Sequence, residues 1–170
     1  MQTARLELRT IAEDDVEALA ALDARPEMRA AIDPFGEHVP EDPAALLAYA
    51  RRLVGHPGFL AAIERETGAL VGCFQFEEPD GRPTERELGY RLHPGTWAKG
   101  YATEGAEALL REAFARPGIT RVYGHSLLDN PGSIRVMEKI GMTYVGPWSY
   151  RGLPGAEYEA LAPSSRPDGP

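Results

Sequence analysis

The amino-acid sequence predicts an α/β (α+β) fold, with a mixed, mostly antiparallel sheet flanked by helices. Short apolar segments, some alternating with polar residues, are separated by turn signals, which is typical of strands. Longer segments repeat apolar residues every three or four positions, as amphipathic helices do. Three strands in series precede a strand–helix unit, and this order indicates a mixed sheet.

The first third of the chain predicts one strand followed by helices. Residues 5–10 alternate in the pattern of a half-buried strand. The acidic run Glu13-Asp14-Asp15 suits the first turn of a helix, and residues 26–32 predict a second, short helix. Residues 33–41 contain two prolines and a glycine and predict a loop. Asp42-Pro43 then predicts a helix start, with an aspartate N-cap and proline at the first helical position.

The remaining elements follow from hairpin and helix-stop signals. Strands are predicted at 59–63 and 70–76 around Glu66-Thr67-Gly68, and another ends at Leu92. A long helix follows, then a strand at 121–126 and a short helix from Ser133 to Ile140, ended by Gly141. The closing strands are predicted at 142–145 and 157–161, with Pro154-Gly155 in the turn between them. Residues 1–162 are predicted to form one domain, and the composition of 163–170 predicts a disordered tail.

Composition excludes several classes of function. The 170 residues carry a net charge of −8, which argues against non-specific nucleic-acid binding. No apolar run approaches the ~20 residues that span a bilayer, and no signal peptide is evident. The single cysteine, Cys73, permits no internal disulfide, lies in an apolar run and is expected to be a buried packing residue in a cytoplasmic protein. No metal site is expected, because no His/Cys/Asp cluster has ligand spacing.

Residues 87–110 carry the strongest functional signal. A strand leads into a turn containing Gly95 and Gly100, and then into an amphipathic helix. Free N–H groups in the first turn of that helix form an anion site, to which Lys99 adds a positive charge. Gly100 and Ala102 would let a phosphate approach the main chain. An ordinary turn that binds nothing is the alternative; the spacing fits neither a P-loop nor a dinucleotide fingerprint.

Two motifs resemble the GNAT N-acetyltransferase superfamily, and its RimJ/RimL-like branch in particular. The first is Glu-Leu-Gly-Tyr followed by Trp-Ala-Lys-Gly-Tyr-Ala-Thr-Glu, in which Trp97 stands where Gln or Arg is often found. The second is Asp129-Asn-Pro-Gly-Ser, followed by a helix ending in Glu-Lys-Ile-Gly-Met. The N-terminal segment RLELRTIAEDDVEAL is also similar to that branch, so that the resemblance covers most of residues 5–146.

The resemblance implies a GNAT fold with splayed middle strands and about four helices. It implies acetyl-CoA as cofactor and direct acetyl transfer to a primary amine, either a protein N-terminal α-amine or a small molecule. A homodimer is possible, since relatives are often dimers. The residues expected to bind the cofactor are Tyr90, Arg91, Leu92, His93, Trp97, Ala98, Lys99, Gly100, Tyr101, Ala102, Thr103, Asn130 and Ser133.

Only a few residues are candidates for taking the proton of the amine or for protonating the leaving thiolate. Glu87 is the preferred base, directly or through water, although a surface ion pair would also explain it. Tyr90 is a weaker candidate, and a structural role is favoured for His125. Many superfamily members carry a tyrosine acid where this chain has Met137, so the acid role is assigned to Ser133 or a water that it holds.

The acceptor is expected near the variable loop at 33–41. Phe35, Glu37 and His38 are the candidate contacts, with ordinary loop residues as the alternative. The missing tyrosine keeps a second hypothesis open, in which the chain is a catalytically silent CoA-binding module of GNAT type.

Overall fold

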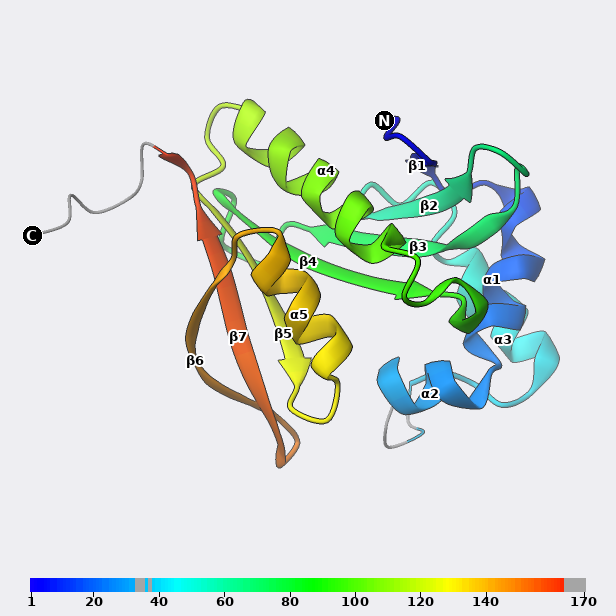
Figure 1. Cartoon of the computed structure of the whole chain (residues 1–170). Coiled ribbons are helices and arrows are strands. Elements are labelled where there is room, and N and C mark those ends of the chain that lie inside the picture. The colour runs from blue at the N-terminus through cyan, green and yellow to red at the C-terminus, as the bar shows by residue number, and fades with distance from the viewer. Residues whose placement is uncertain (33–35, 37, 164–170) are drawn as a thin grey trace, which may run out of the picture. The chain divides into compact units, whose positions relative to one another are not determined.

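The computed structural model describes residues 1–32, 36 and 38–163 (Figure 1). Within these residues it has seven strands and five α-helices, one more helix than the four expected. The strands are hydrogen-bonded in the order β1-β2-β3-β4-β5-β7-β6, and the sheet is mixed and mostly antiparallel, as predicted. Two compact units are distinguished: Met1–Gln75 with Tyr90–Gly105, and Phe76–Gly89 with Ala106–Pro170.

The first unit holds β1 to β3 and the first three helices. The bounds are β1 Leu6–Thr10, α1 Val16–Asp23, α2 Pro26–Ile32, α3 Pro43–Arg51, β2 Phe59–Glu64 and β3 Leu70–Glu77, of which the last two residues belong to the second unit. Asp42 caps α3 by accepting a hydrogen bond from the Ala45 N–H at 2.8 Å, as the Asp-Pro signal predicts. The predicted hairpin between β2 and β3 is confirmed, with Gly68 at φ 72° in the turn.

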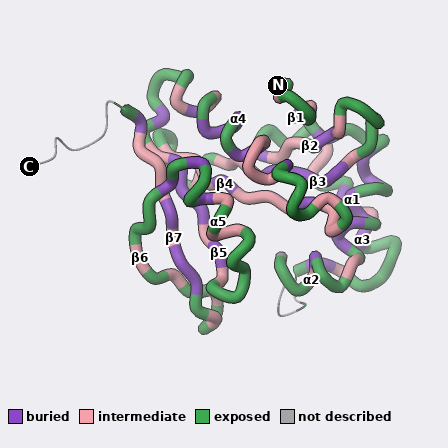
Figure 2. The backbone as a smooth tube through the Cα atoms, viewed as in Figure 1, coloured by how far each residue is buried: buried purple, intermediate pink, exposed green. Residues whose placement is uncertain are grey.

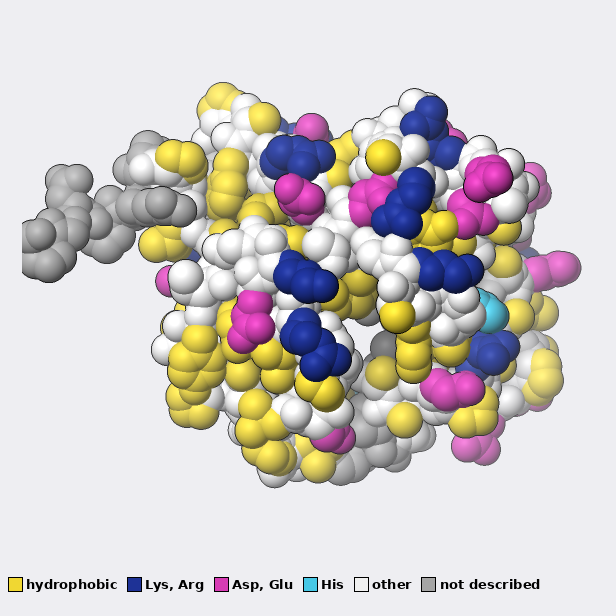
Figure 3. All heavy atoms as spheres, in the orientation of Figure 1, with side chains coloured by type: hydrophobic (Ala, Val, Ile, Leu, Met, Phe, Trp, Pro, Cys, Tyr) yellow, Lys and Arg dark blue, Asp and Glu magenta, His cyan; other side chains and the backbone are white. Residues whose placement is uncertain are grey.

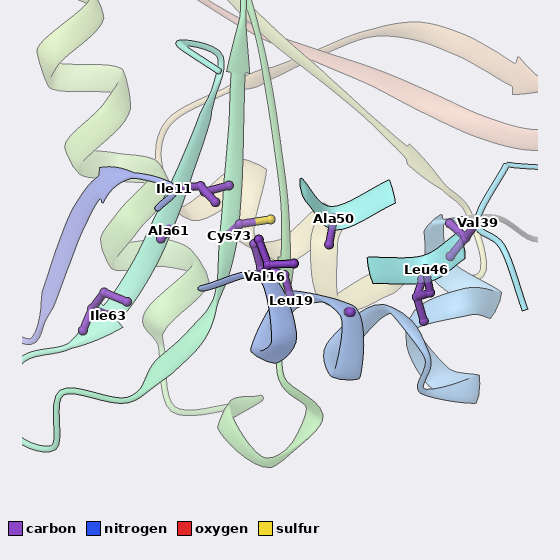
Figure 4. Packing of buried hydrophobic residues seen from close by; sticks show 10 residues of the cluster. Ile11, Val16, Leu19, Val39, Leu46, Ala50, Ala61, Ile63 and Cys73 are labelled. Carbon is purple, nitrogen blue, oxygen red and sulfur yellow. The ribbon is translucent and has the colours of Figure 1, made fainter. Parts of the chain in front are cut away.

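The core of the first unit lies between this sheet and the helices α1 and α3. Cys73 of β3, Val16 and Leu19 of α1 and Ala50 of α3 are buried together (Figure 4). Cys73 is 1% exposed, which confirms its packing role, and burial raises the pKa of its thiol. Its neighbour Phe74 faces the other side of the strand, as the two-residue period requires.

The second unit is built on β5 and a long hairpin. The bounds are β5 Arg121–Leu127, α5 Pro131–Lys139, β6 Thr143–Tyr150 and β7 Leu153–Leu161. β5 pairs antiparallel with β7 along its whole length, and β7 pairs with β6. Figure 2 shows the resulting asymmetry: β7, between two neighbours, is mostly buried or half-buried, whereas the edge strand β6 is largely exposed. No helix among the described residues combines the length and apolarity needed to cross a membrane.

The turn of this last hairpin differs from the prediction. It lies at Arg151-Gly152, both with positive φ (51° and 91°), as a two-residue turn of type I′ requires. Pro154 and Gly155 lie inside β7. The glycine is needed for close approach, because a Cβ there would lie 2.6 Å from the Trp148 ring and 2.7 Å from the Ser126 carbonyl oxygen. The strands are therefore several residues longer than expected.

Two elements run through both units. They are β4, Glu85–Leu92, and α4, Tyr101–Ala115. The parallel pairing of β4 with β5 is registered only over Glu85–Glu87 and Arg121–Tyr123, which fits the expected splaying of the middle strands.

Candidate functional site

The candidate anion site lies where the chain enters α4. A single turn of 3₁₀ helix at Pro94–Thr96 is followed by turns over 97–100, and α4 begins at Tyr101. Ala98 (φ 61°) and Gly100 (φ 85°) are both left-handed, and residues 97–100 are exposed. The first intrahelical bond runs from the Glu104 N–H to the Gly100 carbonyl at 3.0 Å. The preceding amides, those of residues 101–103, are the ones that a helix leaves without an intrahelical partner.

Arg5, from outside the motif, holds this loop in place. Its Nη1 donates to the Lys99 carbonyl at 2.8 Å, and its Nε donates to Glu104 at 2.7 Å. Glu104 also accepts from the Arg5 main-chain N–H at 2.7 Å and from the Thr3 hydroxyl at 2.5 Å. These contacts lower the pKa of Glu104 although burial alone would raise it. The sequence motif contains Glu104, but it indicates no role for Thr3, Arg5 or Glu104.

The other residues predicted to bind cofactor at this site differ in what they can offer. Tyr101 has a buried side chain whose hydroxyl bonds Glu64, and Arg91 is ion-paired with the fully buried Asp23 at 2.7 Å, so their side chains are engaged within the protein. The Leu92 carbonyl accepts from the Trp97 indole at 2.8 Å, and the His93 N–H donates to the Val71 carbonyl at 2.8 Å.

Tyr90 packs its ring against Phe74, with ring centroids 5.7 Å apart. That contact favours a packing role.

The second motif forms the start of α5. Asn130, and not Ser133, is the N-cap: its Oδ1 accepts from the Ser133 N–H at 3.1 Å, with Pro131 at the first helical position. The helix ends in a Schellman motif, with Met142 N–H donating to the Met137 carbonyl at 3.0 Å and Gly141 at φ 85°. Figure 3 shows basic side chains gathered over α4 and α5; on α5 the exposed basic residues are Arg135 and Lys139.

Met137 faces the sheet and is 5% exposed. Its sulfur would lie 3.4 Å from a Cβ at Gly124 of β5, so it fills the space between α5 and the strand. A buried thioether has no proton to donate, and Met137 therefore contributes packing at this position.

A cluster of polar residues covers the opposite face of β5. Glu87 of β4 lies with Oε1 3.6 Å from Nδ1 of His125, and its Oε2 accepts from the Tyr123 hydroxyl at 3.5 Å. Nε2 of His125 lies 3.1 Å from Glu157 of β7, and its ring stacks on Trp148 of β6 at 4.4 Å between centroids. Sequence reasoning singled out Glu87 but missed Glu157 and Trp148, because only the strand pairing brings them to His125.

Of the three predicted acceptor contacts, the structure describes only one. Phe35 and Glu37 lie outside the described residues. His38 is exposed, in the bend before α3, next to the buried Val39. Among the described residues, no group of three or more His, Cys, Asp or Glu side chains is placed to hold a metal ion.

Comparison with known proteins assigns the family. Residues 5–143 match the family described as "Acetyltransferase (GNAT) domain". The chain is 33% identical to FsC-acetyl coenzyme A-N(2)-transacetylase of Aspergillus fumigatus over 157 residues, which are 85% of this chain but only 65% of the fungal protein.

Solved structures agree. A GNAT-family acetyltransferase of Bacillus anthracis superposes with a TM-score of 0.84 at 26% identity, covering 95% of this chain and 98% of the other. Spermidine N-acetyltransferase of Vibrio cholerae, in complex with CoA and spermine, superposes with a TM-score of 0.76 over 94% of this chain and 96% of the other; at 16% identity it shows the fold alone. The chain belongs to the GNAT acetyltransferase family, a family of N-acetyltransferases that use acetyl-CoA as the acetyl donor.

Proposed function

We propose that this protein transfers the acetyl group of acetyl-CoA directly to a primary amine, in a complex of enzyme and both substrates. The observation that carries the proposal is the exposed turn at 97–100, which opens into the first turn of α4. Main-chain amides there, together with Lys99, suit the pyrophosphate of CoA. The bond from Arg5 to the Lys99 carbonyl holds the loop in position before the cofactor arrives.

The transfer itself makes few demands on the protein. The amine must lose a proton and approach the thioester carbonyl, and positioning can contribute several kcal/mol. Glu87 is the proposed proton acceptor, directly or through a water, since its side chain is 37% exposed and thus open to solvent. As the C–S bond breaks, the thiolate needs a proton. With Met137 unable to supply it, we assign this role to Ser133 or a water that it holds.

Two acceptor classes fit this reaction. The similarity of the motifs to the RimJ/RimL-like branch favours the α-amine of a protein N-terminus. A small amine is the second class; the spermine-bound Vibrio enzyme, which shares the fold, supplies the example to test. An assay of CoA release from acetyl-CoA tests both acceptor classes, with spermidine, kanamycin A or a short peptide with a free α-amine as acceptor. Mass spectrometry of the product then identifies the acetylated nitrogen.

Met137 favours one alternative function, a CoA-binding module without transfer activity. The same assay separates the two. Turnover with any of the three acceptors supports the transferase. Acetyl-CoA binding by calorimetry without turnover on any acceptor supports the silent module, and no binding at all would contradict both.

A further inference from the structure

We propose that His125 is a positioning residue that takes the acceptor's proton on from Glu87, so that Glu87, His125 and Glu157 form a proton relay across three strands. This inference rests on the proposed function. All three side chains belong to the second unit and project from the face of the sheet opposite α5, because Arg121, Tyr123 and His125 alternate with Val122 and Gly124 along β5.

The strand register explains why the three groups meet. Glu87 is opposite Tyr123 in the parallel pair, and His125 is opposite Glu157 in the antiparallel pair. Directly opposed side chains on one face lie within contact distance, and diagonal neighbours lie within reach of long or aromatic side chains. The imidazole therefore lies between a carboxylate on β4 and another on β7.

The two ring nitrogens have different partners. Nε2 lies at hydrogen-bond distance from Glu157 (3.1 Å), so this nitrogen carries the proton in the neutral ring. Nδ1 is 3.6 Å from Oε1 of Glu87, beyond a normal hydrogen bond, as expected when no hydrogen lies between the two atoms. A proton that arrives on Glu87 would shorten this gap and pass to Nδ1.

Glu157 orients the ring and remains charged. Arg121 donates to Glu157 as well as to Glu85 and Glu159, and Arg121 and His125 lower the pKa of Glu157 although burial alone would raise it. A carboxylate that stays ionised can stabilise an imidazolium without taking its proton.

The surroundings of His125 are otherwise aromatic. Trp148 of β6 stacks on one side of the imidazole, and Tyr123 contacts its edge with ring centroids 5.3 Å apart. The hydroxyl of Tyr123 in turn accepts a hydrogen bond from Arg82 at 3.0 Å. These rings restrict the imidazole to the plane that joins the two carboxylates.

The electrostatics agree with a role near neutral pH. Burial lowers the pKa of His125, but Glu87 and Glu157 outweigh that effect, and the pKa of His125 lies above its ordinary value. A proton acceptor works best when its pKa is close to the operating pH.

The protons balance as follows. One N–H bond of the acceptor ammonium breaks and its proton passes to Glu87, then to Nδ1 of His125, and then to solvent. The amine lone pair forms the C–N bond to the thioester carbonyl carbon, and the C–S bond breaks. The second proton lost by the nitrogen ends on the CoA thiolate, so the products are the amide, CoA and one released proton.

The test is the pH dependence of kcat/KM in wild type, His125→Gln and Glu157→Gln, with spermidine, kanamycin A or the α-amine peptide as acceptor, whichever is turned over. His125→Gln is expected to lower kcat about 100-fold at pH 7, to leave the KM for acetyl-CoA unchanged and to abolish the acidic limb. Glu157→Gln removes a negative charge from the ring, so the acidic limb moves down by about one pH unit. Glu159→Gln, on the same face of β7 and paired with Arg121, is the matched control.

Imidazole ¹⁵N NMR provides a reading that needs no acceptor. The Nε2–H tautomer is expected in wild type, with a pKa that falls in Glu157→Gln. An Nδ1–H tautomer in wild type would overturn the relay. So would a His125→Gln variant that turns over at the wild-type rate and keeps the acidic limb of the pH profile. Neither result would contradict the proposed acetyl transfer itself. No turnover with any of the three acceptors would remove the proposed function, and the relay with it.

Discussion

Glu104 illustrates how one side chain can hold a binding loop in place. It receives hydrogen bonds from Thr3 and from both the main chain and the guanidinium of Arg5, and its side chain is 16% exposed. Arg5 in turn bonds the Lys99 carbonyl. The N-terminal segment and the first turn of α4 are thus joined through charge-assisted hydrogen bonds, which are stronger than neutral ones.

Replacing Glu104 with Gln should reduce the free energy of unfolding by about 2 kcal/mol at pH 7, as expected when hydrogen bonds to a half-buried charge are lost. Because its folded pKa is depressed, the stabilisation from Glu104 is present above the unfolded pKa and is lost as pH falls through the folded value. Urea unfolding should therefore show a difference at pH 7 that disappears in strong acid.

Glu107→Gln is the matched control for this prediction. Glu107 is on the same helix in an exposed pair with Arg111, so its loss should change stability by less than about 0.5 kcal/mol. Equal effects of the two substitutions at pH 7 would show that Glu104 does not hold the loop.

At the scale of elements, helix α4 depends on a glycine where it crosses β3. A Cβ at Gly105 would lie 2.2 Å from the Phe74 ring, and Phe74 is fully buried. Alanine in a helix is normally favoured over glycine by up to about 1 kcal/mol. At Gly105 the overlap with the Phe74 ring outweighs that preference, so alanine is expected to lower the stability of the protein.

Gly105→Ala should destabilise the protein by about 1–3 kcal/mol through overpacking. Adding Phe74→Leu should recover part of that loss, since the two positions are in contact and their effects are not additive. Gly132→Ala in α5 is the control, because its Cβ would make only an ordinary contact at 3.5 Å. Thermal or urea unfolding measures these three variants against wild type, and a stabilising Gly105→Ala would refute the close packing.

Elements that depend on local signals could be predicted, and those that depend on pairing could not. The Asp42 cap, the Gly68 hairpin and the Gly141 stop are each determined by one or two neighbouring residues, and all are confirmed. The β6–β7 turn was misplaced, because Arg151 has no sequence preference for positive φ, whereas Pro154-Gly155 resembles a turn. What Gly155 provides is space for Trp148, which lies on another strand.

The residues of the candidate site also fall into those that local sequence identifies and those that only the fold brings together. The anion site is contiguous in sequence, so its glycine, lysine and helix start could be identified from the sequence alone. The contacts of Arg5 with Glu104, and those of His125 with Glu87 and Glu157, join residues from distant segments. No periodicity or motif in a single chain reports such pairs.

At the scale of the whole molecule, the net charge and the charge at the proposed cofactor site have opposite effects on the binding of an anionic ligand. The net charge is −8, yet the proposed ligand is itself strongly anionic. Binding therefore has to come from a local arrangement of amides and Lys99, since the overall field opposes it. Raising the salt concentration should weaken this repulsion as well as the local attraction.

The most direct measurement is calorimetric titration of acetyl-CoA into wild type, Lys99→Glu and Arg111→Glu. Both substitutions reverse one exposed charge, but only Lys99 lies in the turn that leads into α4. We expect Lys99→Glu to raise the Kd about tenfold, or 1.4 kcal/mol, and Arg111→Glu to leave it within about twofold. Equal affinities of wild type and Lys99→Glu, or equal losses in both variants, would contradict a cofactor site at the start of α4.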